Sequence, residues 1–298
     1  MDGISVGSLY ALIALGYTMV YGILRFINFA HSDVFMLGAW VSYTLANVAG
    51  WASPNPPPLA GLVIILGSMV ICGLLGFTIE RLAYRPLRSA PRINVLITAI
   101  GISLLIENVG QLESVFGTRP QRMPTLLPDT SLGQIAGVNL PLVDVMVIGI
   151  ALALMGALQW LIFGTKLGRA MRAVSYDTRV ASLMGIDVDR VISITFVVGS
   201  ALAAAAGFLS ATKYPSLNQP AHSTWILLGL KAFVAAVIGG IGNIRGAMAG
   251  GLLIGFVELF GAAYFSPHLR DVYVFALLIF VLLYRPEGLL GKATVEKV

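Results

Sequence analysis

The chain has 298 residues, of which 57% are hydrophobic and only 11% are charged, and its mean hydropathy is +0.88. Because a soluble domain carries about 25% charged residues, the composition excludes a soluble domain and predicts an integral membrane protein with several helical spans. The net charge is +5, and the single cysteine, Cys72, permits no internal disulfide.

Apolar segments long enough to form spans alternate with polar connections along the whole chain. The expected spans are 3–24, 34–50, 59–79, 93–112, 142–163, 191–212, 225–238, 247–265 and 272–284. The last is short, since at 1.5 Å per residue it covers about 20 Å of a hydrocarbon core of about 30 Å. The connection 80–92 is expected to be a basic loop. We therefore expect one all-α, polytopic transmembrane domain over 1–298, with eight or nine spans.

Small residues predict where two of these spans contact other helices. Gly3, Gly7 and Ala11 form a stripe on the first span, and the span 247–265 contains Gly251 and Gly255 at a four-residue spacing. Such stripes let helix backbones approach closely in lipid.

Two polar segments interrupt the apolar pattern. Residues 25–33, which include Asn28 and His31, follow the first span. The segment 239–246 cannot form a lipid-facing helix, and we expect a broken or re-entrant segment there. Its glycines are Gly239, Gly240, Gly242 and Gly246.

The segment 164–190 is the longest polar connection that also carries a helical pattern. Leu167, Ala170, Met171 and Val174 recur at helical spacing. Asp177 can cap a second short helix, and Gly185 can end it in a left-handed conformation. Four of the Lys and Arg residues lie in 80–92 and five in 166–190. The positive-inside rule therefore places both connections in the cytoplasm.

No arrangement of residues in this sequence predicts bond chemistry. It has no phosphate-binding loop, the three histidines show no metal-ligand spacing, and no Ser/His/Asp set can be argued. We expect no catalytic residue, no metal and no cofactor in this chain. Polar residues at membrane depth are instead candidates for a solute pathway or for ion pairs between helices. They are Asn28, His31, Glu107, Asn108, Lys231, Asn243 and Glu258.

Three stretches resemble one family of transport proteins. They are GSLYALIALGYTMVYGILRFINFAHSDVFMLGA at 7–39, LGRAMRAVSYDTRVASLMGIDVDRVISITFVVGSALAAAAG at 167–207 and GLKAFVAAVIGGIGNIRGAMAGGLLIGFVE at 229–258. Together they resemble the permeases of branched-chain amino-acid ABC importers, most closely the LivH-type subunit.

The resemblance implies a multi-pass permease of the bacterial inner membrane that hydrolyses no ATP itself. Its partners would be a homologous second permease, two cytoplasmic ABC ATPases, a periplasmic amino-acid-binding protein and the lipid bilayer, with no nucleic acid. The segment 164–190 would couple the permease to the ATPases. The candidate coupling residues are Arg169, Arg172, Ala173, Asp177, Ala181 and Gly185.

Two other classes of protein fit the residues alone. An ion-coupled secondary transporter would use Glu107, Lys231 and Glu258 along its pathway, and a channel or membrane scaffold would need no coupling segment. Lys231 and Glu258 also fit a structural ion pair, which is the interpretation that the cost of a lone intramembrane charge favours.

Overall fold

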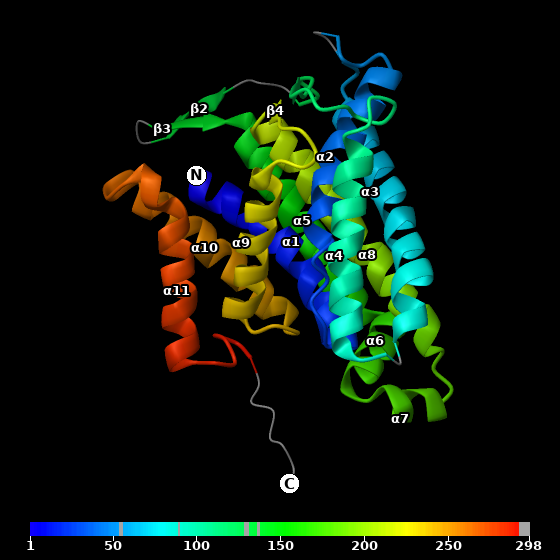
Figure 1. Ribbon diagram of the computed structural model, residues 1–298. Helices are drawn as coiled ribbons and strands as arrows, with labels where there is room; N and C mark the ends of the chain where they lie inside the picture. The colour runs from blue at the N-terminus through cyan, green and yellow to red at the C-terminus, as the bar shows by residue number, and fades with distance from the viewer. Residues whose placement is uncertain (54–55, 89, 128–130, 136–137, 292–298) are drawn as a thin grey trace.

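The computed structural model describes residues 1–53, 56–88, 90–127, 131–135 and 138–291, and these residues form a bundle of helices (Figure 1). The helices are α1 (Asp2–Leu24), α2 (His31–Val48), α3 (Ala60–Ile79), α4 (Arg92–Gly110), α5 (Leu142–Gly164), α6 (Lys166–Tyr176), α7 (Thr178–Leu183), α8 (Val188–Lys213), α9 (Ser223–Gly239), α10 (Ile244–Tyr264) and α11 (Arg270–Tyr284). The short strands β1 (Gln121–Arg122) and β4 (Ser216–Leu217) pair, as do β2 (Ser131–Ile135) and β3 (Val138–Pro141).

Seven helices of the described chain are long and apolar enough to cross a membrane. They are the helices within 2–24, 60–87, 93–110, 142–164, 188–213, 244–264 and 267–284. The polytopic all-α fold is therefore confirmed. A total of eight crossings also requires either α2 or the 17-residue α9, and nine requires both, so the expected number stays a prediction.

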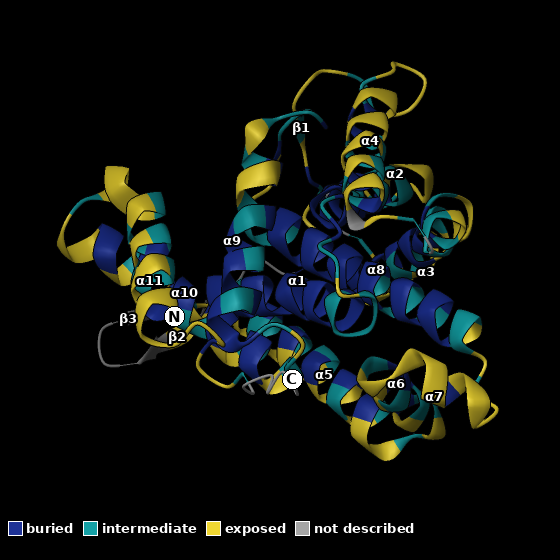
Figure 2. Ribbon diagram, turned by 60° about the horizontal axis from the view of Figure 1, so that its bottom comes forward, coloured by how far each residue is buried: buried dark blue, intermediate teal, exposed yellow. Residues whose placement is uncertain are grey.

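The helix α1 lies at the centre of the bundle and is buried on every side (Figure 2). Its hydrophobicity is uniform around the axis, which is typical of a helix surrounded by protein. The predicted glycine stripe packs against α10, because an added Cβ on Gly255 would overlap the backbone of Gly7 and one on Gly251 would overlap Ala11. The two sequence patterns therefore belong to one helix–helix contact.

A second helix with a small-residue face, α8, packs against α2 and α3. An added Cβ on Gly38 of α2 would overlap the backbone of Ala204, and one on Gly76 of α3 would overlap Ser200. Close backbone approach gives these helices dispersion contacts that lipid cannot replace. The most buried helices, α1 and α8, thus hold the others in place.

The two ends of the bundle differ in structure. The end that carries α6 and α7 is called the inner end here, because its basic residues predict a cytoplasmic location. The opposite, outer end carries the strands (Figure 1). Lys213 forms ion pairs there with Asp2, at 2.8 Å, and with Asp144, and so links the outer ends of α1, α5 and α8.

The expected basic loop at 80–92 is wrong for its first half. Residues Glu80–Tyr84 continue α3 as a π-helical turn, followed by a 3-10 turn at Arg85–Leu87. The physical reason is pairing: the fully buried Glu80 binds Arg88 and accepts a hydrogen bond from Ser193 of α8 at 2.5 Å. Arginines that we expected in solvent instead connect α3 to α8.

Candidate functional site

At the inner end, α6 and α7 form the two short helices that the sequence predicts. The Thr165 hydroxyl caps α6 by accepting a bond from the amide of Gly168 at 3.0 Å. The Asp177 carboxylate caps α7 by accepting bonds from the amides of Arg179 and Val180 at 2.8 and 2.9 Å. Gly185 has a φ of +81°, the left-handed conformation that ends the segment. The predicted caps at Asp177 and Gly185 are confirmed, and Thr165 adds a cap that was not predicted, so the connection is an ordered element.

The apolar face of α6 packs against the bundle, since Met171 and Val174 are buried. The exposed apolar surface lies around α7 instead, and we call it the α7 patch. It consists of Tyr176, Val180, Leu183 and Met184, which are 92%, 54%, 87% and 78% exposed. Large apolar side chains so exposed at a membrane protein's aqueous end are typical of a protein-binding surface.

The candidate coupling residues divide into structural and exposed ones. Arg172 donates a hydrogen bond to the Ile162 carbonyl and stacks on the ring of Phe163 at 5.3 Å, so it braces α6 against α5. Ala181 is buried, Ala173 is half-buried, and the Asp177 carboxylate is used in its cap. Arg169 is exposed beside α6. Charge reversal at Arg172 would therefore disturb the packing of α6 as well as any docking.

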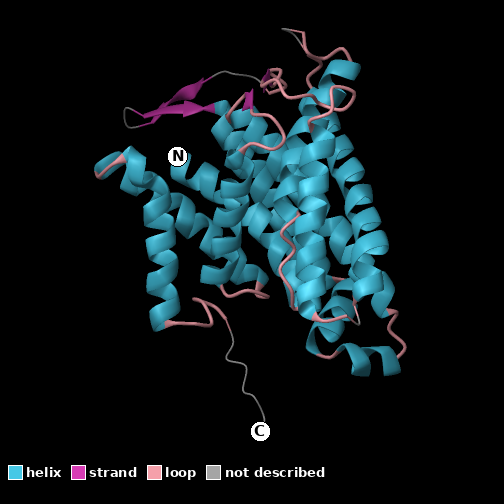
Figure 3. Ribbon diagram, in the orientation of Figure 1, coloured by secondary structure: helices cyan, strands magenta, loops and turns pink. Residues whose placement is uncertain are grey.

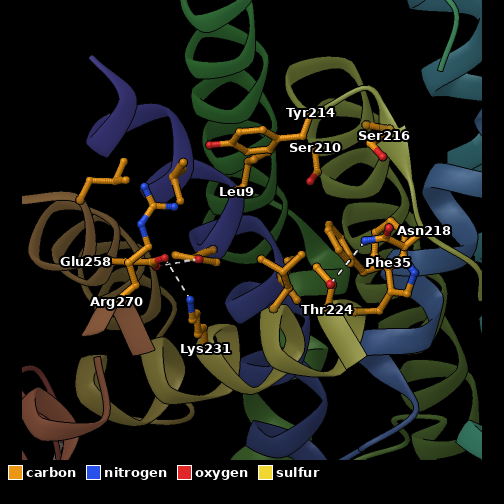
Figure 4. Close-up of a pocket in the computed structure, with 17 residues that line it drawn as sticks. Leu9, Phe35, Ser210, Tyr214, Ser216, Asn218, Thr224, Lys231, Glu258 and Arg270 are labelled. Carbon is orange, nitrogen blue, oxygen red and sulfur yellow. Dashed lines mark hydrogen bonds and ion pairs between the residues drawn. The ribbon is translucent and has the colours of Figure 1, made fainter. Parts of the chain in front are cut away.

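Lys231 and Glu258 meet inside the bundle, as Figure 4 shows. Lys231 Nζ lies 3.0 Å from Glu258 Oε1 and 2.6 Å from Asp271 Oδ1, and Tyr10 donates to Glu258 Oε2 at 2.8 Å. This cluster joins α1, α9, α10 and α11. Because both buried charges are paired and hydrogen-bonded, the ion-pair interpretation agrees with the geometry.

A cavity of about 280 Å³ lies on the outer side of this cluster, and we call it the outer cavity. Lys231, Glu258 and Arg270 line one side, and Asn218 and Thr224 line the other (Figure 4). Burial raises the pKa of Tyr214, which also lines the cavity, so its phenol stays neutral.

The cluster gives a testable asymmetry. Lys231→Met leaves two carboxylates without their shared cation, whereas Glu258→Gln leaves Lys231 paired with Asp271. We expect Lys231→Met to lower the free energy of unfolding of the purified protein by roughly 3–5 kcal/mol, the cost of leaving a buried charge unpaired. Glu258→Gln should lower it less. The double variant should recover part of the loss. Additive losses in a double-mutant cycle would contradict the pairing.

The polar interruption after α1 is a break in the helical structure within the bundle. Residues 25–30 form a loop (Figure 3), and α2 begins at His31, whose imidazole packs against Gly16 of α1. Gly16 lies eight residues, about 12 Å along the helix axis, before Leu24, which ends α1, so the His31 imidazole lies inside the bundle. The polar interruption that the sequence shows at 25–33 is therefore a break between two helices.

The two predicted polar residues of the break have structural contacts. Asn28 accepts a hydrogen bond from Tyr84 at 2.6 Å, which holds the loop against the end of α3. The His31 ring lies 4.7 Å from the ring of Tyr17 in an edge-on arrangement, and its Nε2 has no hydrogen-bond partner among the described residues.

Glu107 and Asn108 of α4 face in different directions, because successive helical residues point about 100° apart. Glu107 is 8% exposed and lines a second cavity, of about 220 Å³, which we call the lateral cavity. Asn108 is exposed and donates to the carbonyl of Leu104 in its own helix at 2.7 Å, so it does not line either cavity.

The helix break predicted at the glycine-rich segment is confirmed, and it is a tight turn between α9 and α10. Gly240 and Gly242 have φ values of +100° and +90°, and added Cβ atoms on Gly239 and Gly246 would overlap each other's backbone. The turn lies at the inner end, where Leu290 donates to the Gly239 carbonyl at 3.1 Å. Asn243 caps α10 and donates to the Leu290 carbonyl at 2.6 Å, so both ends of its amide have structural contacts.

Three further residues complete these sites and were not selected from the sequence. Tyr10 and Asp271 belong to the Lys231 cluster, and Asp33, at 1% exposure, lies in the first turn of α2. The only available signal was the position of Asp33 within the polar interruption. In the described part of the chain, no three His, Cys, Asp or Glu residues gather as metal ligands.

A multi-pass helical bundle with a broken helix, buried ion pairs and an apolar patch on a capped inner-end element defines a membrane transport protein. The family model described as the branched-chain amino acid transport system / permease component matches residues 1–282. This chain therefore belongs to that permease family.

Three of its relatives match over almost their full lengths. The chain is 42% identical over 301 residues to the high-affinity branched-chain amino acid transport system permease protein BraD of Pseudomonas aeruginosa, covering 100% of this chain and 96% of BraD. It is 41% identical over 300 residues to the corresponding LivH of Escherichia coli, with the same coverage. A probable LivH of Methanocaldococcus jannaschii is 28% identical over 95% of this chain and 89% of its own length.

Proposed function

We propose that this chain carries branched-chain and related neutral amino acids across the inner membrane as one permease subunit of an ABC importer. Its family and its full-length relatives support the amino-acid substrate, since BraD and LivH are named for branched-chain amino acid transport. The partners would be a second, homologous permease, two cytoplasmic ATPases and a periplasmic binding protein.

The observation that carries the coupling proposal is the α7 patch. Its apolar side chains are presented by a helix whose two ends are fixed, by Asp177 and by the left-handed Gly185. A rigid element can transmit movement of a motor, whereas a mobile loop would absorb it. The residues 164–190 thus serve as the coupling segment through α7, with Lys166, Arg169 and Arg179 exposed beside the patch.

The proposed substrate is tested by uptake in a strain that lacks its own branched-chain amino-acid importers. Cells that produce this chain with its partner subunits should accumulate labelled L-leucine, and unlabelled L-isoleucine and L-valine should compete. Labelled D-ribose is the control, because two more distant relatives are named sugar import permeases. Ribose uptake without leucine uptake would contradict the proposal.

A further inference from the structure

We propose that the lateral cavity is a binding site for a zwitterionic amino acid with an aliphatic side chain. The proposal rests on the proposed function and adds the place in this chain where the solute is held. The cavity lies between α4 and α9, with α1 and the loop 25–30 behind it. Its volume of about 220 Å³ suits a small solute, since drug-sized ligands occupy roughly 300–1,000 Å³.

The first argument is a pair of buried carboxyl groups at this cavity that no cation neutralises. Glu107 lines the cavity, is 8% exposed, and forms no ion pair among the described residues. Nearby Asp33 is 1% exposed, and neither of its carboxylate oxygens has a hydrogen-bond partner there. No Lys or Arg lines the cavity. A buried carboxylate without a partner is expensive at membrane depth, so these groups are suited to receive a cation.

The outer cavity is the less suitable site for an ammonium group, because its charged side chains are already paired. There, Lys231 and Glu258 already pair with each other, and Asp271 and Tyr10 complete their contacts. An incoming ammonium would have to break those bonds. At Glu107 it would join two carboxyl groups, Glu107 and Asp33, that have no cation partner among the described residues, which makes the lateral cavity the better site.

The second argument is a positive helix end beside the same cavity. The first turn of α2 begins inside the bundle, and Ser32 of that turn lines the cavity. The His31 amide donates to the Asn28 carbonyl at 3.2 Å and Asp33 belongs to the same turn, but no side chain of the described residues caps it. The first amides of a helix lack intrahelical partners, and together with the helix dipole they attract anions. A broken helix that directs such an end at a solute carboxylate is a known solution in membrane transporters.

The remaining walls fit a branched aliphatic side chain. They are formed by Tyr17, Ile27, Phe29, Ile100, Leu104, Ile226, Leu230 and Phe233. Ile100, Leu104 and Ile226 are also 44%, 54% and 43% exposed, so the cavity opens laterally between α4 and α9. The ammonium would lie at Glu107, the carboxylate at the start of α2, and the side chain against these apolar walls.

The charge of the site can be measured with a cysteine probe. Cys72 is the one cysteine of the sequence and is buried, so Ser103→Cys in a Cys72→Ser background places one reactive thiol at the cavity. In the purified complex, cationic aminoethyl methanethiosulfonate should react faster than anionic sulfonatoethyl methanethiosulfonate, by about tenfold beyond their ratio with a free thiol. Glu107→Gln should remove most of that preference. A preference that is absent, or unchanged by Glu107→Gln, would overturn the proposal.

Protection of this thiol tests for a zwitterion. L-Leucine should slow the labelling of Ser103→Cys, whereas isocaproate, which lacks the ammonium, and 3-methylbutylamine, which lacks the carboxylate, should protect much less. Equal protection by the amine would show a cation site and overturn the amino-acid assignment.

Uptake separates this proposal from the proposed function. Glu107→Gln should lower L-leucine uptake about 10- to 100-fold, the usual value of a hydrogen bond to a charged group, and Glu107→Asp should restore part of it. The matched control is Glu113→Gln, an exposed carboxylate beyond the outer end of α4. Normal leucine uptake with Glu107→Gln overturns the site and leaves the permease function intact. If the wild-type importer carries no branched-chain amino acid, the proposed function fails, while the charge preference at Ser103→Cys still reports on the cavity.

Discussion

Replacing Gly255 with leucine is expected to abolish folded permease. An added Cβ at this position would overlap the backbone of Gly7 and the carbonyl of Gly3 on α1. The helix α1 cannot move away, because it is buried on all sides at the centre of the bundle. Overpacking in a well-packed core costs roughly 1–3 kcal/mol and occasionally more, and a backbone contact that cannot relax lies at the upper end.

The matched control is Gly149→Leu in α5. Gly149 also lies within a long apolar helix, but an added Cβ there meets no atom within 4 Å. Membrane yield, monodispersity in detergent and melting temperature should remain near wild type for Gly149→Leu and collapse for Gly255→Leu. Equal behaviour of the two variants would mean that α1 and α10 do not pack as the structure shows.

The second large effect is expected at the α7 patch. Leu183→Glu places a charge on a side chain that is 87% exposed and contacts little of its own protein. The permease should therefore insert and fold, while ATP-driven uptake falls about 30-fold or more, the loss expected from a central residue of a protein interface. The measurement is uptake normalised to the amount of folded permease, together with co-purification of the ATPase.

The control for that variant is Val48→Glu, since Val48 is 82% exposed and ends α2 at the outer end. It adds the same charge to a similarly exposed position away from the inner end. If Leu183→Glu retains both uptake and co-purification, the ATPases do not dock on α7.

Features that depend on nearby residues were predictable from the sequence. The helix caps at Asp177 and Gly185 lie where the pattern places them, because a cap is decided by a few adjacent residues. The glycine stripes on α1 and α10 were also predictable as helix contacts. Which stripe meets which was not, because that pairing joins segments about 250 residues apart.

The features that the sequence analysis placed wrongly depend on contacts between distant parts of the chain. The turn at Gly240 looked like a break at membrane depth, but its contacts with residues near Leu290 place it at the inner end. The arginines of 80–92 looked solvated, because the buried carboxylate of Glu80 that binds Arg88 was not identifiable from sequence. The lateral cavity likewise combines Glu107 with Ser32, which no local pattern connects.

The measurement that tests the account most directly is L-leucine uptake into proteoliposomes that contain the assembled importer. Uptake should require the amino-acid-binding protein outside and ATP on the side of the ATPases, and it should be unaffected when ionophores collapse the proton and sodium gradients. Uptake that continues without ATP and follows an imposed ion gradient would contradict the account and identify an ion-coupled transporter.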